Sequence, residues 1–383
     1  MDWNNFNMHI CFLSPEYPLW STGGIGSFIQ TIGRGLVKEG HNVTVIGSSN
    51  LKNGSFIDDE GVSVYRLSAP KIFKKGKFVE NGFKIRKKIK EINSKSPIDI
   101  VETSESGLFL LPNKTPYKKV IRLHGGHHFF AESENRPIYA WKARQERISF
   151  KKADAFAAAT QYVIDHTSKY LSMAGRPLEV INFPIDSIRF PQADLSKTIK
   201  HKLVFAGTVC EKKGIRQLIQ AFPIVAEKYP DVTLDIYGRD WFFSDGASYI
   251  QFLKNQFSKE TFNNITFRGS VKLEEICQKY AEAELCVFPS HMETLGLVAP
   301  EAMMTGKPVL FSNTGPGPEI ISHKITGLLC DPLNPINIAE NILFAFDKPE
   351  IMEKIAKEGK KFALEKFDAK NSVNANIDFY KNL

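Results

Sequence analysis

Residues 285–311, LCVFPSHMETLGLVAPEAMMTGKPVLF, constrain the fold more than any other stretch of the chain. The unbroken apolar run at 285–288 is typical of a strand that is buried on both faces. A loop follows it, and a short helix is predicted from about residue 297 to 305, with Gly306 as its stop signal. A second buried strand is predicted over 308–311. The order strand, loop, helix, strand is the repeating unit of parallel α/β sheets.

The loop in this stretch has the chemistry of a site for phosphate and hydroxyl groups. A strand that leads into a helix through a glycine-containing loop presents free backbone N–H groups, which suit phosphate. Glu293 lies in the loop and Glu301 lies inside the predicted helix. A carboxylate gains nothing from a neighbouring diphosphate, but it can accept hydrogen bonds from the hydroxyls of a ribose or a sugar. The stretch therefore predicts a sugar nucleotide as the ligand.

The length and composition predict a globular protein of two domains. A chain of 383 residues is too long for one ordinary core and suits two domains of roughly 150–200 residues each. No apolar run approaches the ~20 residues of a membrane span, and the first residues, MDWNNFNMHICFL, do not resemble a signal peptide. The cysteines are odd in number and form no CxxC pair, so we expect reduced thiols and a cytoplasmic protein. They are Cys11, Cys210, Cys277, Cys286 and Cys330.

Strand and helix patterns alternate along both halves of the chain, which predicts an α/β fold with two doubly wound parallel sheets. The segment INFPID at 181–186 interrupts the alternation, which then restarts. We therefore expect a Rossmann-like N-terminal domain over 1–186 and a Rossmann-like C-terminal domain over 187–365. A final helix at 366–383 is expected to pack back on the first domain. Open parallel sheets bind ligands beyond the carboxyl ends of their strands, so we expect one cleft site between the domains.

The excess of positive charge is concentrated in one segment. Lys+Arg exceeds Asp+Glu by 50 − 42 = 8, and residues 71–90 alone hold nine basic residues and one acidic residue. Ile85, Ile89 and Ile92 recur at helical spacing, which predicts a helix with a core stripe and a basic outer face. A solvated surface is one interpretation of that face. The other is peripheral contact with anionic lipid headgroups or with an anionic acceptor. We do not expect a nucleic-acid partner, because no nucleic-acid-binding motif appears.

Two loops in the N-terminal half are candidates for ligand contact. The loop at 22–26, TGGIG, can approach a ligand closely at Gly24, although it lacks the G-x-G-x-x-G pattern and a plain tight turn is the alternative. His124 ends a predicted strand, with His127 and His128 close behind. A metal site needs three or four ligands, and the sequence shows no clear carboxylate partner for these histidines. We prefer contact between His124 and a substrate hydroxyl, with a purely structural histidine as the alternative.

A further loop, at 207–214, follows a strand of the C-terminal half and opens a helix. Lys213 at that position opposes the helix dipole unless an anion lies nearby. An anion-binding lysine and an ordinary surface lysine are therefore both open interpretations.

Taken together, these residues resemble the retaining glycosyltransferases of family 4 (glycosyltransferase group 1), which have the two-domain GT-B fold. The most specific motif of that family is a glutamate, seven residues and a second glutamate, within the pattern PSxxE…GLVxxEAMxxGxPV. The resemblance extends over essentially the whole chain, from the Gly-Gly loop to the C-terminal helix. The matching residues here are Pro289, Ser290, Glu293, Gly296, Leu297, Val298, Glu301, Ala302, Met303, Gly306, Pro308 and Val309.

The resemblance implies a role for each residue of the site. Glu301 would hold the ribose of the nucleotide, and Glu293 would contact the hydroxyls of the transferred sugar. Lys213 would stabilise the diphosphate leaving group. His124 would contact the donor sugar near the reacting carbon, and Gly24 would meet the diphosphate. The remaining donor-binding residues implied are Arg268, which would border the base, and Thr294, Leu295, Gly296 and Leu297, whose backbone N–H groups would line the sugar and the diphosphate.

One position departs from the family pattern. The family often has an arginine directly after the glycine of the phosphate loop, whereas this chain has Thr208. Stabilisation of the leaving group would then depend on Lys213, with Lys212 or Arg239 as compensating cations.

The implied activity is transfer of a hexose from a UDP-, GDP- or ADP-sugar to a glycan or lipid-linked acceptor. The resemblance further implies retention of configuration and no metal or other cofactor, and the chain has no Asp-x-Asp metal motif. The implied setting is polysaccharide biosynthesis in the cytoplasm or at the inner face of the membrane. The first alternative is a nucleotide-sugar 2-epimerase of the same fold, for which the expected second carboxylate cluster is missing. The second is a catalytically silent sugar-nucleotide binder, which only Thr208 favours.

Overall fold

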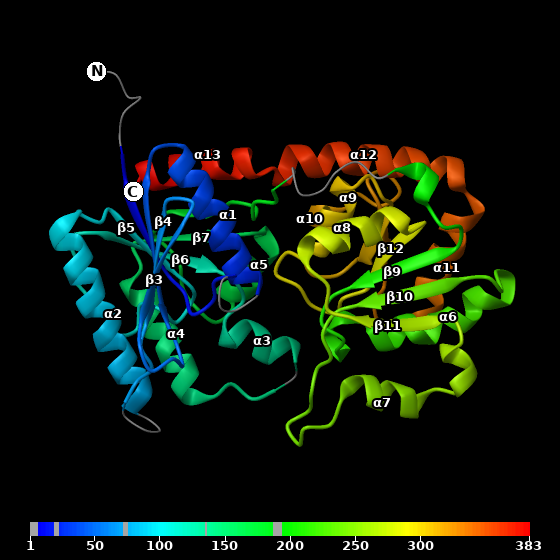
Figure 1. Ribbon diagram of the computed structural model, residues 1–383, viewed down its shortest axis with the longest axis horizontal. Coiled ribbons are helices and arrows are strands. Elements are labelled where there is room, and N and C mark those ends of the chain that lie inside the picture. Colours follow the sequence, from blue (N-terminus) through cyan, green and yellow to red (C-terminus); the bar gives the residue numbers. More distant parts are fainter. Residues whose placement is uncertain (1–6, 19–22, 72–75, 135, 187–193) are drawn as a thin grey trace. The chain divides into compact units, whose positions relative to one another are not determined.

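The computed structural model describes residues 7–18, 23–71, 76–134, 136–186 and 194–383. The chain forms two compact units (Figure 1). The first unit contains the chain up to Pro184 together with Ala369–Leu383, and the second contains Ile185–Asp368. The sequence predicts the boundaries after residues 186 and 365, whereas the contacts place them after Pro184 and Asp368. Thr22, the start of the Gly-Gly loop, and positions 72–75 of the basic segment lie outside the described residues.

In the described residues, the first unit has one eight-stranded sheet in the order β3-β4-β2-β1-β5-β6-β7-β8. All pairs are parallel except β3 with β4, which is antiparallel. The sequence predicts the parallel sheet but not β3. The elements of this unit are β1 (His9–Leu13), α1 (Gly24–Lys38), β2 (Asn42–Ser48), β3 (Ser55–Asp59), β4 (Val62–Leu67), α2 (Gly76–Lys95), β5 (Ile100–Thr103), β6 (Lys118–Leu123), α3 (His127–Ser133), α4 (Ala140–Lys152), β7 (Ala155–Ala158), α5 (Gln161–Ser168), β8 (Leu178–Val180) and α13 (Ala369–Lys381).

Helix α1 packs on this sheet through one apolar stripe. Phe28, Ile32 and Leu36, spaced one turn apart, are all buried. The helix begins at Gly24. It ends just before Gly40, which has a φ of 86°, a conformation that glycine adopts without strain.

The C-terminal helix α13 completes the first unit. In Figure 1 it lies beside α1. The two helices approach closely at Gly35, where an added Cβ would lie 2.3 Å from Cγ2 of Val373. Under α13, the fully buried Arg122 donates from Nε to Glu102 at 2.6 Å and from Nη2 to the amide oxygen of Asn376. Hydrogen bonds of this kind are required when a charge is buried.

In the described residues, the second unit has one six-stranded parallel sheet in the order β11-β10-β9-β12-β13-β14. Its central strands are completely buried, which explains their unbroken apolar sequences. The elements of this unit are η3 (Leu195–Lys197), β9 (Lys202–Ala206), η4 (Glu211–Lys213), α6 (Ile215–Lys228), β10 (Thr233–Tyr237), α7 (Tyr249–Gln256), η5 (Lys259–Phe262), β11 (Ile265–Gly269), α8 (Leu273–Glu282), β12 (Leu285–Phe288), α9 (Val298–Met304), β13 (Val309–Ser312), α10 (Gly317–Ile320), β14 (Leu328–Cys330), α11 (Pro335–Asp347) and α12 (Pro349–Phe367).

Two sequence expectations about the whole chain can be compared with the described residues. All five cysteines are buried and free of disulfides, as their number and spacing suggest. None of the described helices is both long and apolar enough to cross a membrane.

Candidate functional site

The candidate site in the second unit begins where two loops touch. Gly214, at the end of η4, has a φ of 69°, and an added Cβ would lie 1.8 Å from the carbonyl oxygen of Pro289. Only glycine fits at such a contact. The backbone N–H of His291 donates to the carbonyl of Lys212 at 2.9 Å, so the two loops are joined on both sides of the contact. The loops after β9 and β12 are therefore held against each other by their backbones.

This contact brings together two of the predicted site residues. The ammonium of Lys213 donates to the carboxylate of Glu293 in an ion pair. Their side chains are 21% and 13% exposed, respectively, so both charges are partly shielded from water. A lysine fixed in this way can present its charge to an anion without first losing side-chain entropy.

The loop after Glu293 turns sharply at Gly296. That residue has a φ of 81°, and an added Cβ would lie 2.6 Å from the ring of Phe311. Across the residues that the structure describes, no hydrogen-bond acceptor is found for the backbone N–H groups of Leu295, Gly296 and Leu297. Thr294, also predicted to bind the donor, is half-buried at the start of the same turn. The turn thus presents consecutive backbone donors of the kind that bind phosphate or sugar oxygens.

Glu301 lies in the first turn of α9 and is half-buried. Burial raises the pKa of its carboxyl group to about 7. Within the described part of the chain, the carboxylate makes no hydrogen bond or ion pair. A desolvated carboxylate without a partner is unfavourable in the protein alone, and hydroxyl donors from a ligand would relieve that cost.

The loop after β9 also carries Thr208, where the family pattern has arginine. Thr208 is half-buried and follows Gly207, whose carbonyl oxygen would lie 1.7 Å from a Cβ added to Gly238. The N–H of Val209 donates to the carbonyl of Arg239 at 2.9 Å. The exposed Arg239 therefore follows β10 beside the loop that carries Thr208.

Arg268 is not part of this cluster. It lies on β11, an edge strand that β10 and β9 separate from β12. Its Nε donates to the buried carboxylate of Asp235 at 2.8 Å, while the side chain remains 49% exposed. The structure therefore gives Arg268 a structural ion pair, which the sequence does not predict.

In the first unit, His124 follows β6 and lies between two aromatic rings. Its ring centroid is 5.5 Å from that of Phe28 and 5.1 Å from that of Phe183. Burial and the charge of Arg122 lower the pKa of the imidazole to about 3. His124 is therefore neutral at physiological pH and can form hydrogen bonds with a hydroxyl without carrying charge.

Two buried glutamates hold the loop that carries His124, and sequence reasoning missed both. The N–H of His124 donates to Glu105 at 2.7 Å, and burial raises the pKa of Glu105 to about 8. Glu146 accepts hydrogen bonds from the backbone of His127 and from the backbone and ring of His128. The structure thus gives the backbone of His127 and both the backbone and the ring of His128 a carboxylate partner that the sequence does not reveal. One sequence feature could have indicated the role of Glu146: it is the one acidic residue in the otherwise basic sequence AWKARQERISFKK of α4.

Gly24 opens α1, one turn before Phe28, so the packing of His124 on Phe28 places both predicted residues near the start of this helix. A Cβ added to Gly24 would meet no atom within 4 Å. Packing within the described residues therefore does not require glycine here, and close approach by a ligand remains a reason for it. A search of the described residues finds no group of three or more His, Cys, Asp and Glu side chains that could hold a metal ion.

Comparisons with known proteins agree with this architecture. The family model described as glycosyl transferases group 1 matches residues 187–362, and the model described as Glycosyltransferase Family 4 matches residues 22–189. An uncharacterized glycosyltransferase of Methanocaldococcus jannaschii, MJ1607, is 25% identical over 98% of each chain.

Solved structures resemble the chain over its whole length. Sucrose-phosphate synthase from Thermosynechococcus elongatus has a TM-score of 0.85 at 21% identity, covering 98% of this chain and 99% of that one. The Anabaena protein Alr3699/HepE, solved in complex with UDP and glucose, has a TM-score of 0.76 at 18% identity, covering 98% of this chain and all of that one. The two family models together account for residues 22–362, and the chain belongs to the group 1 glycosyltransferases and has the GT-B fold.

Proposed function

We propose that the protein transfers a sugar from a nucleoside diphosphate sugar to a hydroxyl of a glycan or lipid-linked acceptor, with retention of configuration and without a metal. The observation that carries this proposal is the carboxylate of Glu301, which is desolvated and has no partner in the described chain. Ribose hydroxyls would supply the missing hydrogen-bond donors. Alr3699/HepE has the same fold and was solved in complex with UDP and glucose, which supports a uridine nucleotide sugar as the first donor to test.

The reaction requires stabilisation of the negative charge that grows on the leaving diphosphate. The ammonium of Lys213 and the N–H groups of Leu295, Gly296 and Leu297 would provide it, with Gly24 and Thr208 as further contacts. Such donors are effective because they are already oriented before the charge develops. Arg239 would supply a second positive charge for the diphosphate, because Thr208 stands where the family often has an arginine.

The transferred sugar would be held by groups that bind hydroxyls. Glu293 would accept hydrogen bonds from the sugar while its ion pair keeps Lys213 in place. His124, being neutral, would bind the sugar close to the reacting carbon without adding a positive charge there. We assign no protein side chain as general base, because an oxygen of the leaving diphosphate can itself take the proton of the acceptor. Arg268 would border the base with the part of its guanidinium not bonded to Asp235.

The test is an assay with radiolabelled UDP-, GDP- and ADP-sugars, in which release of nucleoside diphosphate and transfer of label are both measured. We expect one donor to be consumed, activity to persist in EDTA, and the product to keep the donor's anomeric configuration by NMR. The substitution Lys213→Met should lower kcat by roughly 10²–10³-fold, because it removes one stabilising donor from the transition state. The matched control is Lys254→Met, which removes an exposed lysine from α7, away from these loops.

Other outcomes would contradict the proposal. Epimerisation of the donor without release of nucleoside diphosphate would instead identify an isomerase. Binding of a nucleotide sugar without any turnover would identify a silent binder. Equal kcat values for the Lys213→Met variant and the wild type would remove Lys213 from the mechanism.

A further inference from the structure

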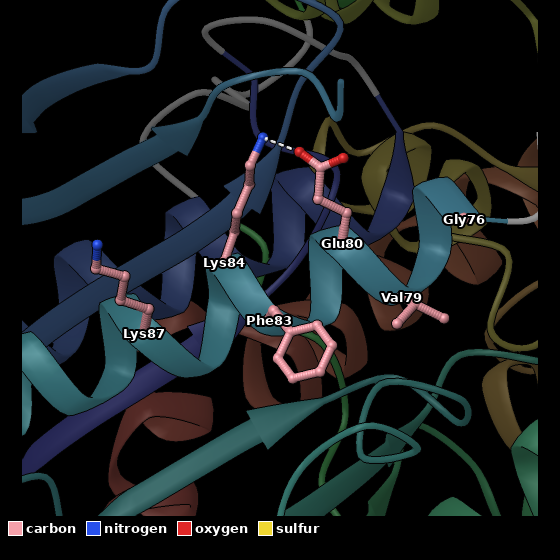
Figure 2. Close-up of a pocket in the computed structure, with 6 residues that line it drawn as sticks. All are labelled: Gly76, Val79, Glu80, Phe83, Lys84 and Lys87. Carbon is pink, nitrogen blue, oxygen red and sulfur yellow. Dashed lines mark ion pairs between the residues drawn. The ribbon is translucent and has the colours of Figure 1, made fainter. Parts of the chain in front are cut away.

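The outer face of α2 exposes apolar side chains that the core does not require. Val79 is 44% exposed and Phe83 is 61% exposed, one helical turn apart. Figure 2 shows both projecting from α2 on the side away from the Glu80–Lys84 ion pair. They border a shallow hollow lined by Gly76, Val79, Glu80, Phe83, Lys84 and Lys87.

The same face carries positive charge that no described carboxylate neutralises. Arg86 and Lys90 continue the helical stripe of Val79 and Phe83, and Lys87 lies next to it. All three are exposed, and none forms an ion pair with a residue in the described part of the chain. Both acidic residues of α2 are already paired elsewhere on the helix, Glu80 with Lys84 at 2.9 Å and Glu91 with Lys88 at 2.8 Å.

An aromatic cluster extends this face to a second helix. The ring of Phe78 lies 5.5 Å from that of Phe109 and 6.2 Å from that of Trp141, at the start of α4. Trp141 is 53% exposed, and the next exposed residues of α4, Lys142 and Arg144, are both basic. Figure 1 shows α2 and α4 together in the first unit. We name Val79, Phe83, Arg86, Lys87, Lys90 and Trp141 the α2–α4 face.

We propose that the α2–α4 face docks on the surface of an anionic lipid bilayer. Unpaired lysines and arginines are attracted to anionic headgroups, and exposed tryptophan and phenylalanine side chains partition into the headgroup layer. A solvated surface would explain the cations but not the exposed aromatic and aliphatic side chains among them. A nucleic-acid surface does not account for the exposed Val79 beside the aromatic rings, because aliphatic side chains do not stack on bases.

The proposal does not depend on the reaction, because the docking residues are distinct from those assigned to the donor site. Its test uses the full-length protein and two kinds of vesicle, one of phosphatidylcholine alone and one that also contains phosphatidylglycerol. We expect co-sedimentation with the anionic vesicles only, loss of binding as salt rises, and a blue shift of tryptophan fluorescence on binding.

Two variants separate the electrostatic and apolar contributions. The double substitution Arg86→Glu/Lys87→Glu should weaken vesicle binding at least about 25-fold, since each basic residue contributes roughly a factor of five near such a surface. Phe83→Ala should weaken binding while leaving its salt dependence unchanged. The matched control is Lys354→Glu/Lys357→Glu, which changes the net charge equally at two exposed positions of α12. Circular dichroism confirms that each variant is folded.

Three results would overturn the proposal. Equal binding to neutral and anionic vesicles would exclude recognition of anionic headgroups. Equal losses in the α12 control and in the Arg86/Lys87 variant would show that only net charge matters. Loss of affinity for RNA but not for vesicles in the Arg86/Lys87 variant would make the face a nucleic-acid surface.

Discussion

At the scale of single residues, Glu301 makes the folded chain less stable than it could be. Burial raises the pKa of its carboxyl group to about 7, whereas a glutamate in an unfolded chain titrates near ~4.3. Between these two values the folded chain binds more protons than the unfolded chain, so the contribution of this group to stability falls as pH rises. The cost is therefore absent at low pH and largest above pH ~7.

We predict that Glu301→Gln stabilises the protein at alkaline pH and weakens nucleotide binding. The free energy of unfolding should rise by about 1–3 kcal/mol at pH ~8 and change little at pH ~4, because only the charged carboxylate is penalised. Urea unfolding at the two pH values measures this difference. Glu293→Gln is the control, because its carboxylate is already paired with Lys213 and its removal should give no gain. A gain of equal size at both pH values would show that the charge of Glu301 is not the cause.

The same residue predicts how nucleotide affinity depends on pH. The ionised carboxylate is the better acceptor for ribose hydroxyls, so affinity should rise between pH ~6 and ~8 in the wild type. Ionisation of the nucleotide's phosphate groups affects binding to the wild type and to Glu301→Gln alike. The difference between the two pH profiles of affinity therefore isolates the contribution of Glu301. Calorimetric titration that gives the same pH dependence in both proteins would contradict this role.

The sequence reveals the motif that contains Glu293 and Glu301, but it does not reveal most of the contacts that these loops make. The spacing of Glu293 and Glu301 is local and can be read directly. The ion pair of Glu293 with Lys213 depends on the contact between Gly214 and Pro289, which no local pattern reveals. The support of the His124 loop by Glu105 and Glu146 likewise depends on how separate elements pack.

At the scale of secondary-structure elements, the parallel strands were predictable and the edge strand β3 was not. Buried strands have continuous apolar sequences, so β12 has the predicted bounds and β13 is shifted by only one residue. Four of the five residues of β3 are exposed, and its sequence SFIDD shows no clean alternation. An exposed edge strand is specified by its pairing with β4 rather than by its own residues.

The contact between α1 and α13 gives a prediction at this scale. An alanine Cβ at position 35 would overlap Cγ2 of Val373, so Gly35→Ala should force the helices apart, although alanine favours the helix itself by about 1 kcal/mol. Val373→Ala alone removes buried methyl groups and should destabilise the protein. In the Gly35→Ala background the same truncation relieves the overlap. We therefore expect a coupling energy of at least about 1 kcal/mol in the double-mutant cycle, measured by urea unfolding. Additive effects of the two substitutions would mean that the helices adjust freely at this contact.

At the scale of the whole molecule, the second unit is an insertion within the first. The chain leaves the first unit after Pro184 and returns to it at Ala369, where α13 packs against α1. Each unit has its own sheet and its own buried core. The alternation of strands and helices predicts two such units. The polar network that fixes the returning helix, formed by Arg122, Glu102 and Asn376, joins distant parts of the sequence and was not predictable.

The five buried cysteines allow the stability of each unit to be followed separately in one protein. Cys11 lies in the first unit, and the other four lie in the second. If the nucleotide binds mainly to the second unit, it should stabilise that unit by RT ln(1 + [L]/Kd), which is about 2.7 kcal/mol at a nucleotide concentration of 100 Kd. We therefore expect UDP, or whichever nucleotide the assay identifies, to slow thiol labelling of the four cysteines in moderate urea by up to about 100-fold and to affect Cys11 much less. Mass spectrometry of peptides after pulsed labelling gives each rate separately, and Glu301→Gln is the control in which the protection should be lost. Equal protection of Cys11 would contradict the prediction, because it would mean that both units unfold together or that both bind the nucleotide equally.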